Sequence, residues 1–333
     1  MQLDFSEIKN TKNLLAFSAG VDSTALFFLL LKNHISFDIA IVNYNLRPQS
    51  KDEVDYAKQL AKKYNKEIYI KEVSFQTEPS NFEKKARDIR YDFFNEIINE
   101  NSYETLITAH QLNDKLEWFL MQLTKGAGLF ELIGFEKCIL KNEILFYKPL
   151  LEISKDNLKN YLDKNSLKYF IDNSNENEKY KRNYFRHNFS DKLIAEFGCG
   201  LKNSFEYLQN DLNSLNKDFT AIKSIKELDI FKNLNDDNLN IRLIDLNLKK
   251  RGYLLSKAQR DEILTQKEIS ISDTINIAIN DYFIYICPKV LSNMDKKFKE
   301  ECRVNKIPKN IRPYLNEEKI NIKELIDPAQ LTV

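Results

Sequence analysis

Long apolar runs are absent from this chain of 333 residues, which is also poor in cysteine, histidine and glycine. No stretch approaches the roughly 20 apolar residues that a membrane-spanning helix needs, so we expect no membrane partner. Residues 1–12 are polar and mixed in charge and lack the apolar core of a signal peptide. Together these absences predict a cytoplasmic location.

Only four cysteines and three histidines occur, and the cysteines include no C-x-x-C pair. Scattered thiols of this kind favour free cysteines in a reducing compartment over disulfides. The histidines do not cluster as the ligands of a zinc centre do. The sequence therefore predicts neither a disulfide framework nor a zinc site.

Charge is nearly balanced, at a formal net value of +1, so overall electrostatics does not predict a nucleic-acid partner. The hydrophobic fraction of 43% is enough for real cores, and the length predicts two or three compact units. With only seven glycines in the chain, each glycine in a loop is more informative than usual.

The first half of the chain alternates strand and helix patterns. Helical patterns separate short apolar runs that predict strands at 13–17, 37–43, 67–73, 104–110 and 145–150. Two of the helices open on predicted capping boxes, Ser50 with Glu53 and Ser80 with Glu83. This alternation predicts an α/β fold with a doubly wound parallel sheet and right-handed crossovers.

Ligands of such sheets bind beyond the carboxyl ends of the strands, near the switch in strand order. The loop at Ser18, the segment after Val42 and the segment at His110 all follow predicted strands. We therefore expect these three segments to converge on one crevice.

Helical patterns prevail beyond residue 151. We expect residues 1–200 to form a catalytic domain, 201–226 a linker helix, and 227–333 a mainly helical domain with a small β element. Apolar runs at 269–279 and 282–286 predict that β element.

A tight turn between the first strand and helix consists of Ser18, Ala19, Gly20, Val21, Asp22 and Ser23. Backbone N–H groups at such a turn converge on an anion site, and the serines add hydroxyl donors. Asp22 suits a Mg²⁺ ion that accompanies a nucleoside triphosphate. The loop lacks the lysine of G-x-x-x-x-G-K-[ST], so it is not a Walker-type site. An ordinary serine-capped helix is the alternative.

This turn resembles the S-G-G-x-D-S loop of the PP-loop ATP pyrophosphatases, with Ala19 in place of one glycine. That replacement strains the loop only if the position needs a positive φ. Further segments resemble, in order, motifs of the tRNA(Ile)-lysidine synthetases. The segments of this chain, each with the family motif in parentheses, are 42–47 (H-V-N-H-G-L-R), 83–94 (E-x-x-A-R-x-x-R-Y-x-x-[FL]), 108–117 (T-A-H-H-x-D-D-Q-x-E), 148–151 (R-P-L-L) and 172–186 (D-x-S-N…Y-x-R-N…R).

The resemblance implies an ATP-dependent carbon–nitrogen ligase of the PP-loop, Rossmann-like fold. Such an enzyme joins free L-lysine to C2 of the wobble cytidine in the CAU anticodon of isoleucine tRNA. ATP adenylates the cytidine with release of pyrophosphate, and the lysine amine then displaces AMP. ATP and Mg²⁺ are the implied cofactors, with Asp22 as the metal ligand and Ser18 to Ser23 and Val42 as the nucleotide-binding residues. A homodimer is left open, as is tRNA contact by the C-terminal domain.

Three polar residues after the strand at 104–110 join Asp22 as catalytic candidates. His110 ends that strand, and Asp114 and Glu117 lie on one face of the next helix. The two acids would hold the lysine ammonium groups or accept a proton, and His110 would stabilise phosphate or orient a carboxylate. By position alone, acids that complement a helix dipole are the simpler explanation.

Basic residues in two segments are candidates for contact with phosphate or RNA. Arg87 and Arg90 lie three apart on one helix, where Arg90 is a catalytic candidate and Arg87 a tRNA contact or a surface ion pair. In the second segment, basic residues alternate with aromatic ones, a pattern that suits phosphates and unpaired bases as well as a solvated helix surface. The tRNA-binding candidates there are Lys181, Arg182 and Arg186.

Some positions depart from the resembled motifs. Asn113 replaces the first acid of the D-D pair, and Lys115 replaces a glutamine. Neither change touches the acidic candidates, so we expect an active enzyme. The rival functions are tRNA 2-thiolation by another PP-loop enzyme, which needs reactive cysteines, and non-catalytic tRNA binding.

Overall fold

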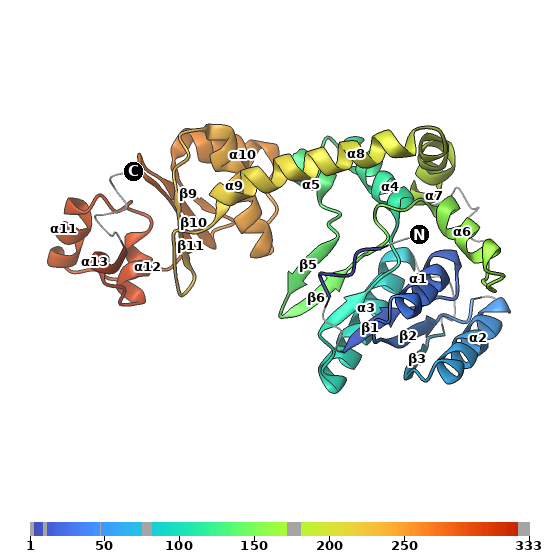
Figure 1. Ribbon diagram of the computed structural model, residues 1–333. Helices are drawn as coiled ribbons and strands as arrows, with labels where there is room; N and C mark the ends of the chain where they lie inside the picture. The colour runs from blue at the N-terminus through green and yellow to red at the C-terminus, as the bar shows by residue number, and fades with distance from the viewer. Residues whose placement is uncertain (1–2, 9–11, 47, 75–81, 172–180, 326–333) are drawn as a thin grey trace. The chain divides into compact units, whose positions relative to one another are not determined.

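The computed structural model describes residues 3–8, 12–46, 48–74, 82–171 and 181–325 (Figure 1). The chain forms two compact units, Met1–Asn210 and Asp211–Val333. The capping box predicted at Ser80 and most of the motif predicted at 172–186 lie outside the described residues.

A six-stranded sheet with the order β3-β2-β1-β4-β6-β5 forms the centre of the first unit. All neighbouring strands pair in parallel except β5 and β6, which form an antiparallel hairpin at one edge. The strands are β1 (Asn13–Ala16), β2 (Asp38–Asn43), β3 (Ile68–Glu72), β4 (Thr105–Ile107), β5 (Cys138–Lys141) and β6 (Ile144–Tyr147). The direction of winding reverses at β1, so ligands are expected beyond its carboxyl end.

Helices cover both faces of this sheet. Leu14 and Leu15 are adjacent in β1 and point to opposite faces. Leu15 packs with the apolar residues of α1 (Val21–Lys32), α2 (Gln49–Lys63) and α6 (Lys155–Lys164), and Leu14 packs with those of α3 (Phe82–Asn101). The predicted doubly wound α/β fold is confirmed.

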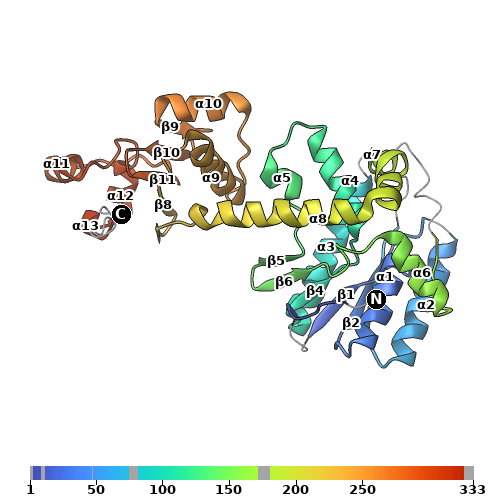
Figure 2. The ribbon, with the colours of Figure 1, turned by 45° about the horizontal axis from the view of Figure 1, so that its top comes forward.

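Three further helical segments complete the first unit near the end of β4. Helix α4 (Leu112–Leu123) is followed by the short α5 (Leu129–Ile133), and α7 (Lys181–Phe185) continues through a π-helical turn (Arg186–Ser190) into α8 (Asp191–Asn216). Both α7 and the π-helical turn pack against α4, as Figure 2 shows for α7. Residues far apart in the sequence are thereby placed together.

The second unit contains a five-stranded antiparallel sheet with the order β7-β8-β11-β10-β9. Its strands are β7 (Lys223–Ile225), β8 (Leu228–Lys232), β9 (Glu268–Ile271), β10 (Ile275–Ile279) and β11 (Phe283–Pro288). One face packs against α9 (Asp237–Lys250) and α10 (Lys257–Gln266). The other packs against α11 (Lys296–Val304), α12 (Arg312–Glu317) and α13 (Ile322–Leu325).

The helix expected over residues 201–226 is the C-terminal part of α8, which has a kink at Phe197 (φ −122°, ψ 17°), and it ends at Asn216. Phe219, Ile222 and Ile225 are spaced by three, which also fits one face of a helix. In the structure Phe219 packs into one apolar cluster, and Ile222 and Ile225 into another. The chain instead turns at Lys226, with a φ of 52°, to form the hairpin of β7 and β8.

Two other local predictions were wrong. The run at 269–279 is a hairpin of β9 and β10, because Ser272 and Asp273 adopt φ angles of 49° and 56° and the chain turns over the three residues 272–274. Helix α2 begins at Gln49, so Ser50 is not its cap. Pro48 already has helical angles, with a φ of −55° and a ψ of −39°, and the helix starts directly after it.

Within the described ranges, none of the helices has the length and apolar character that crossing a membrane requires.

Candidate functional site

The loop from Ser18 to Ser23 joins the end of β1 to the start of α1. Ala19 is fully buried and takes a φ of 59°, the left-handed region that glycine enters without penalty and alanine at a cost of about 1 kcal/mol. Gly20 has a φ of −74°, which any residue adopts. The replacement of glycine by Ala19 therefore does strain the loop.

Hydrogen bonds hold this loop closed on itself. The Ser18 amide donates to the Ser23 hydroxyl at 3.2 Å, and the two hydroxyl oxygens are 3.1 Å apart. The Ala19 carbonyl accepts from the Phe170 amide at 3.0 Å. No side chain caps the N-terminus of α1, so its first amides are available to an anion.

Asp22 is the acidic residue at this helix N-terminus. Its Oδ1 atom is buried and has no hydrogen-bond partner among the described residues. Burial and the neighbouring Asp114 raise the pKa of Asp22 to about 7, although the charges of Lys155 and Arg186 oppose this. A buried carboxylate oxygen without a partner fits a cation that arrives with a ligand.

Mg²⁺ fits this donor set, since it commonly takes one or two carboxylates, waters and substrate phosphates. Among the described residues, no group of three or more histidine, cysteine or acidic side chains forms a metal site on its own. Asp22 would therefore hold the ion together with the phosphates of a bound nucleotide.

Two acids on α4 are paired with two arginines from the 181–190 segment. Glu117 is only 1% exposed and accepts from Arg182 Nε at 2.8 Å and from Arg186 Nε at 2.6 Å. Asp114 accepts from Arg182 as well, and lies 3.6 Å from Arg186. Burial raises the pKa of Asp114, but the charges of Arg182, His110 and Arg186 outweigh it and hold the pKa below its ordinary value.

The exposed fractions of the two arginines differ. The Arg186 side chain is 12% exposed, whereas that of Arg182 is 41% exposed. Arg186 is thus enclosed by its contacts, and Arg182 retains a solvent-facing edge that a ligand can reach.

His110 lies just beyond β4. Its Nδ1 is 2.9 Å from the Thr108 hydroxyl, and its ring meets the Phe135 ring edge-on with centroids 5.2 Å apart. Burial lowers the pKa of His110 to about 4, so the imidazole is neutral at pH 7. A neutral ring can orient a carboxylate or a hydroxyl but brings no charge to a phosphate.

The remaining predicted residues lie around this centre. Val42 is half-buried in β2, and Arg87 and Arg90 are exposed on α3, with the Arg87 guanidinium 4.6 Å from the centre of the Tyr91 ring. Lys181 is exposed, and its Nζ lies 5.8 Å from the centre of the Phe185 ring. Arg90 is close enough to Tyr44 for its charge to oppose the rise that burial causes in the pKa of Tyr44.

Sequence reasoning missed Lys155, the first residue of α6, whose charge acts on Asp22. Its signal was the helix start at Ser154, which caps α6 by accepting from the Asn157 amide. Lys148 was noticed only as part of a motif. It is buried, and its Nζ donates to the Glu136 carbonyl at 2.9 Å.

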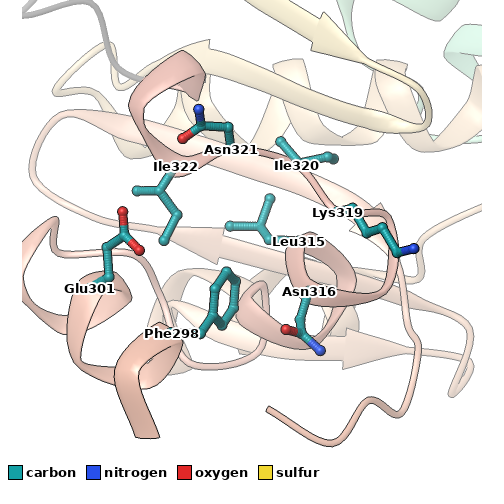
Figure 3. Close-up of a pocket in the computed structure, with 8 residues that line it drawn as sticks. All are labelled: Phe298, Glu301, Leu315, Asn316, Lys319, Ile320, Asn321 and Ile322. Carbon is teal, nitrogen blue, oxygen red and sulfur yellow. The ribbon is translucent and has the colours of Figure 1, made fainter. Parts of the chain in front are cut away.

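A cavity of about 280 Å³ lies in the second unit, and none of the predicted site residues lines it (Figure 3). Its wall is mixed, with apolar residues beside two asparagines and the charged Glu301 and Lys319. The lining residues include no arginine for phosphate.

Known proteins resemble the chain over most of its length. The PP-loop domain family matches residues 2–193. A tRNA(Ile)-lysidine synthase of Campylobacter jejuni (strain RM1221) is 47% identical over 320 residues, which cover 96% of this chain and 96% of that protein. The enzymes of the same name from Helicobacter hepaticus (strain ATCC 51449 / 3B1) and Helicobacter pylori (strain ATCC 700392 / 26695) are each 40% identical. The alignment with the Helicobacter hepaticus enzyme covers 92% of this chain and 82% of that protein. The alignment with the Helicobacter pylori enzyme covers 93% of this chain and 91% of that protein.

Proposed function

Because this chain belongs to the tRNA(Ile)-lysidine synthase family, we propose that its ATP-dependent formation of lysidine takes place between the 18–23 loop and helix α4. The family and the ligase activity predicted from the motifs are confirmed by these relatives. One observation carries the placement of the site: the unpartnered, buried oxygen of Asp22 lies at the uncapped N-terminus of α1.

The loop would bind the β- and γ-phosphates of ATP. Its outward amides and the hydroxyls of Ser18 and Ser23 suit phosphate oxygens, and the dipole of α1 favours their charge. Mg²⁺ held by Asp22 would neutralise charge that develops on the leaving pyrophosphate. The half-buried Lys155 adds positive charge on the same side.

In the first step the cytidine O2 attacks the α-phosphorus of ATP. A bond forms between that oxygen and phosphorus as the bond to pyrophosphate breaks, and pyrophosphate leaves with the electron pair. The protein's task is to align the two reactants and stabilise the leaving group, and the loop supplies donors for the latter.

In the second step an amine of lysine attacks C2 of the cytidine, and AMP leaves. Asp114 and Glu117 remain the proposed holders of lysine, although Arg182 and Arg186 now occupy them. A lysine ammonium carries the same charge as a guanidinium, so it can replace the half-exposed Arg182 at Asp114. With the ammonium in the place of Arg182, Asp114 keeps a neighbouring positive charge, so it stays a carboxylate that can hold the lysine.

The displaced Arg182 would then face the tRNA, as predicted for it. Exposed Tyr184 and Phe189 lie beside it in the sequence, with ring centroids 5.9 Å apart. Aromatic faces of this kind stack on unpaired bases, and Lys181 adds a charge for the backbone. The exposed Arg87 and Arg90 on α3 are the other proposed contacts with phosphate.

The cysteines do not favour a 2-thiolation enzyme. Burial raises the pKa of the Cys138 thiol, and raises those of Cys287 and Cys302 to about 12 and about 11. Thiols of this kind are poor nucleophiles, because the reactive form is the thiolate. Within the described residues, the fourth cysteine, Cys199, is exposed and also unpaired.

The experiment that tests the proposed function is pyrophosphate release by the purified protein with ATP, lysine and isoleucine tRNA. We expect release to require the tRNA and to disappear when the wobble cytidine is replaced by uridine. Equal release without tRNA would contradict the proposal.

A further inference from the structure

Asn113 contacts two segments that border the proposed active site. It is buried in the first turn of α4, and its Nδ2 donates to Asp191 Oδ1 at 2.7 Å. Its Oδ1 accepts from the backbone amide of Lys155 at 3.2 Å. A single side chain thus links α4 to the starts of α6 and α8.

The chemistry of both contacts requires an amide at this position. Asp191 is an acceptor, and the Lys155 amide is a donor, so the side chain between them has to donate on one side and accept on the other. A carboxylate at position 113 would place two like charges about 2.7 Å apart at the Asp191 contact.

The two contacts act on residues that face the proposed reaction. Lys155 begins α6, which packs against α1, the helix whose first turn carries Asp22. Asp191 directly follows the π-helical turn that carries Arg186. Asn113 therefore supplements the ion pairs of Asp114 and Glu117 as a third point at which α4 holds the 181–191 segment.

We propose that Asn113 and Asp191 form an amide–carboxylate pair that positions Lys155 and the Arg182–Arg186 segment for adenylation. The pair needs one amide and one carboxylate, and these can be swapped between the two positions. Where the resembled motif carries the first of two acids, this chain carries the amide, and Asp191 supplies the acid across the contact. The departure at Asn113 is thus compensated within the chain. This inference rests on the proposed function.

The test compares N113D, D191N and the exchanged double variant N113D/D191N in pyrophosphate release. We expect N113D to lower kcat by about tenfold or more, since repulsion between residue 113 and Asp191 moves the segment that carries Arg182 and Arg186, while the carboxylate still accepts from the Lys155 amide. D191N alone keeps a donor and an acceptor at the contact, so its loss is smaller. The double variant restores one amide and one carboxylate and should recover kcat to within about threefold of the parent.

A matched control is N247D in the second unit. There Asn247 Nδ2 donates to Asp229 Oδ2 at 2.9 Å, a contact of the same type between residues of the other unit. We expect N247D to leave kcat and the KM for ATP unchanged. Urea unfolding of every variant shows that the assays are made on folded protein.

Two results would overturn the inference: parent-like kinetics of N113D, or a double variant no better than N113D. A shift confined to the unfolding midpoint, with kcat and KM intact, would also overturn it, because it would make the pair merely structural. Failure of the proposed function looks different, since the unmodified protein would then release no pyrophosphate in response to tRNA.

Discussion

Arg182 donates through Nε to the buried Oε2 of Glu117 at 2.8 Å, while 41% of its own side chain remains exposed. Its other end contacts Asp114, and Arg186 completes a cluster of two acids and two arginines. A buried carboxylate such as that of Glu117 destabilises the fold if its positively charged partners are removed. The cluster thus fixes the 181–190 segment on α4 and leaves one cation able to exchange.

Removal of Glu117 should destabilise the first unit. E117A leaves Arg186 enclosed without its main partner, and breaking a buried pair of this kind costs about 3 kcal/mol or more. Urea unfolding measures the effect. The control is E300A, which breaks the solvent-exposed pair with Arg303 and should leave the unfolding midpoint unchanged. A midpoint for E117A equal to that of E300A would contradict the cluster.

Substitutions at the loop separate backbone strain from ligand approach. A19G relieves about 1 kcal/mol of left-handed strain and loses a buried methyl worth about 0.8 kcal/mol, so its stability should stay close to that of the parent. G20A should also fold normally, because the added Cβ meets only Ser18 Oγ, at 3.5 Å.

Gly20 nevertheless lies where phosphate is proposed to approach, so G20A should raise the KM for ATP while A19G leaves it unchanged. Steady-state pyrophosphate release measures both constants. Unchanged ATP kinetics in G20A would argue against close approach of phosphate at this residue.

His110 should make stability depend on pH. Its pKa in the folded protein, about 4, lies below the ordinary 6.5, so between these values the unfolded chain binds more protons. Unfolding free energy should therefore rise by about 2 to 3 kcal/mol as pH increases from 4 to 6.5. In H110Q this part of the slope disappears. H34Q, at an exposed histidine, is the control for the substitution itself.

Tyr184 and Phe189 should contribute to tRNA affinity and leave ATP binding alone. Loss of base stacking costs about 1 to 3 kcal/mol per base, so the variant Y184A/F189A should bind tRNA at least fivefold more weakly. Filter binding measures tRNA, and the KM for ATP is the internal comparison. The exposed Tyr207 on α8 offers a control, Y207A, for unspecific loss of an aromatic side chain.

Much of the first unit could be predicted, because its strands and turns are encoded in short stretches of consecutive residues. Buried parallel strands such as β1 and β2 are continuous apolar runs, and the turn at Ser18 to Ser23 carries its own phosphate-binding pattern. Right-handed crossovers restrict the topology, but the strand order and the antiparallel edge strand β5 were not predicted. Asp22, His110 and Asp114 were placed near one strand edge by this reasoning alone.

The pairing of side chains could not be predicted in the same way. Arg182 and Glu117 are distant in the sequence, and no periodicity states that the segment after Lys181 returns to α4. The same holds for Asn113 and Asp191. Their contact explains why an asparagine can stand where the resembled motif has an acid. In the second unit, the spacing of Phe219, Ile222 and Ile225 suited a helix and a hairpin equally, and tertiary packing decided between them.

The most direct test of the account is mass analysis of isoleucine tRNA after incubation with the protein, ATP and isotopically labelled lysine. We predict that the anticodon fragment gains one lysine less one water at the wobble cytidine. The same incubation with D22N should give no gain. We expect D22N to fold, because the Oδ1 atom of Asp22 makes no hydrogen bond within the described part of the chain. An unmodified fragment after incubation with the active parent protein, or full modification by D22N, would contradict the account.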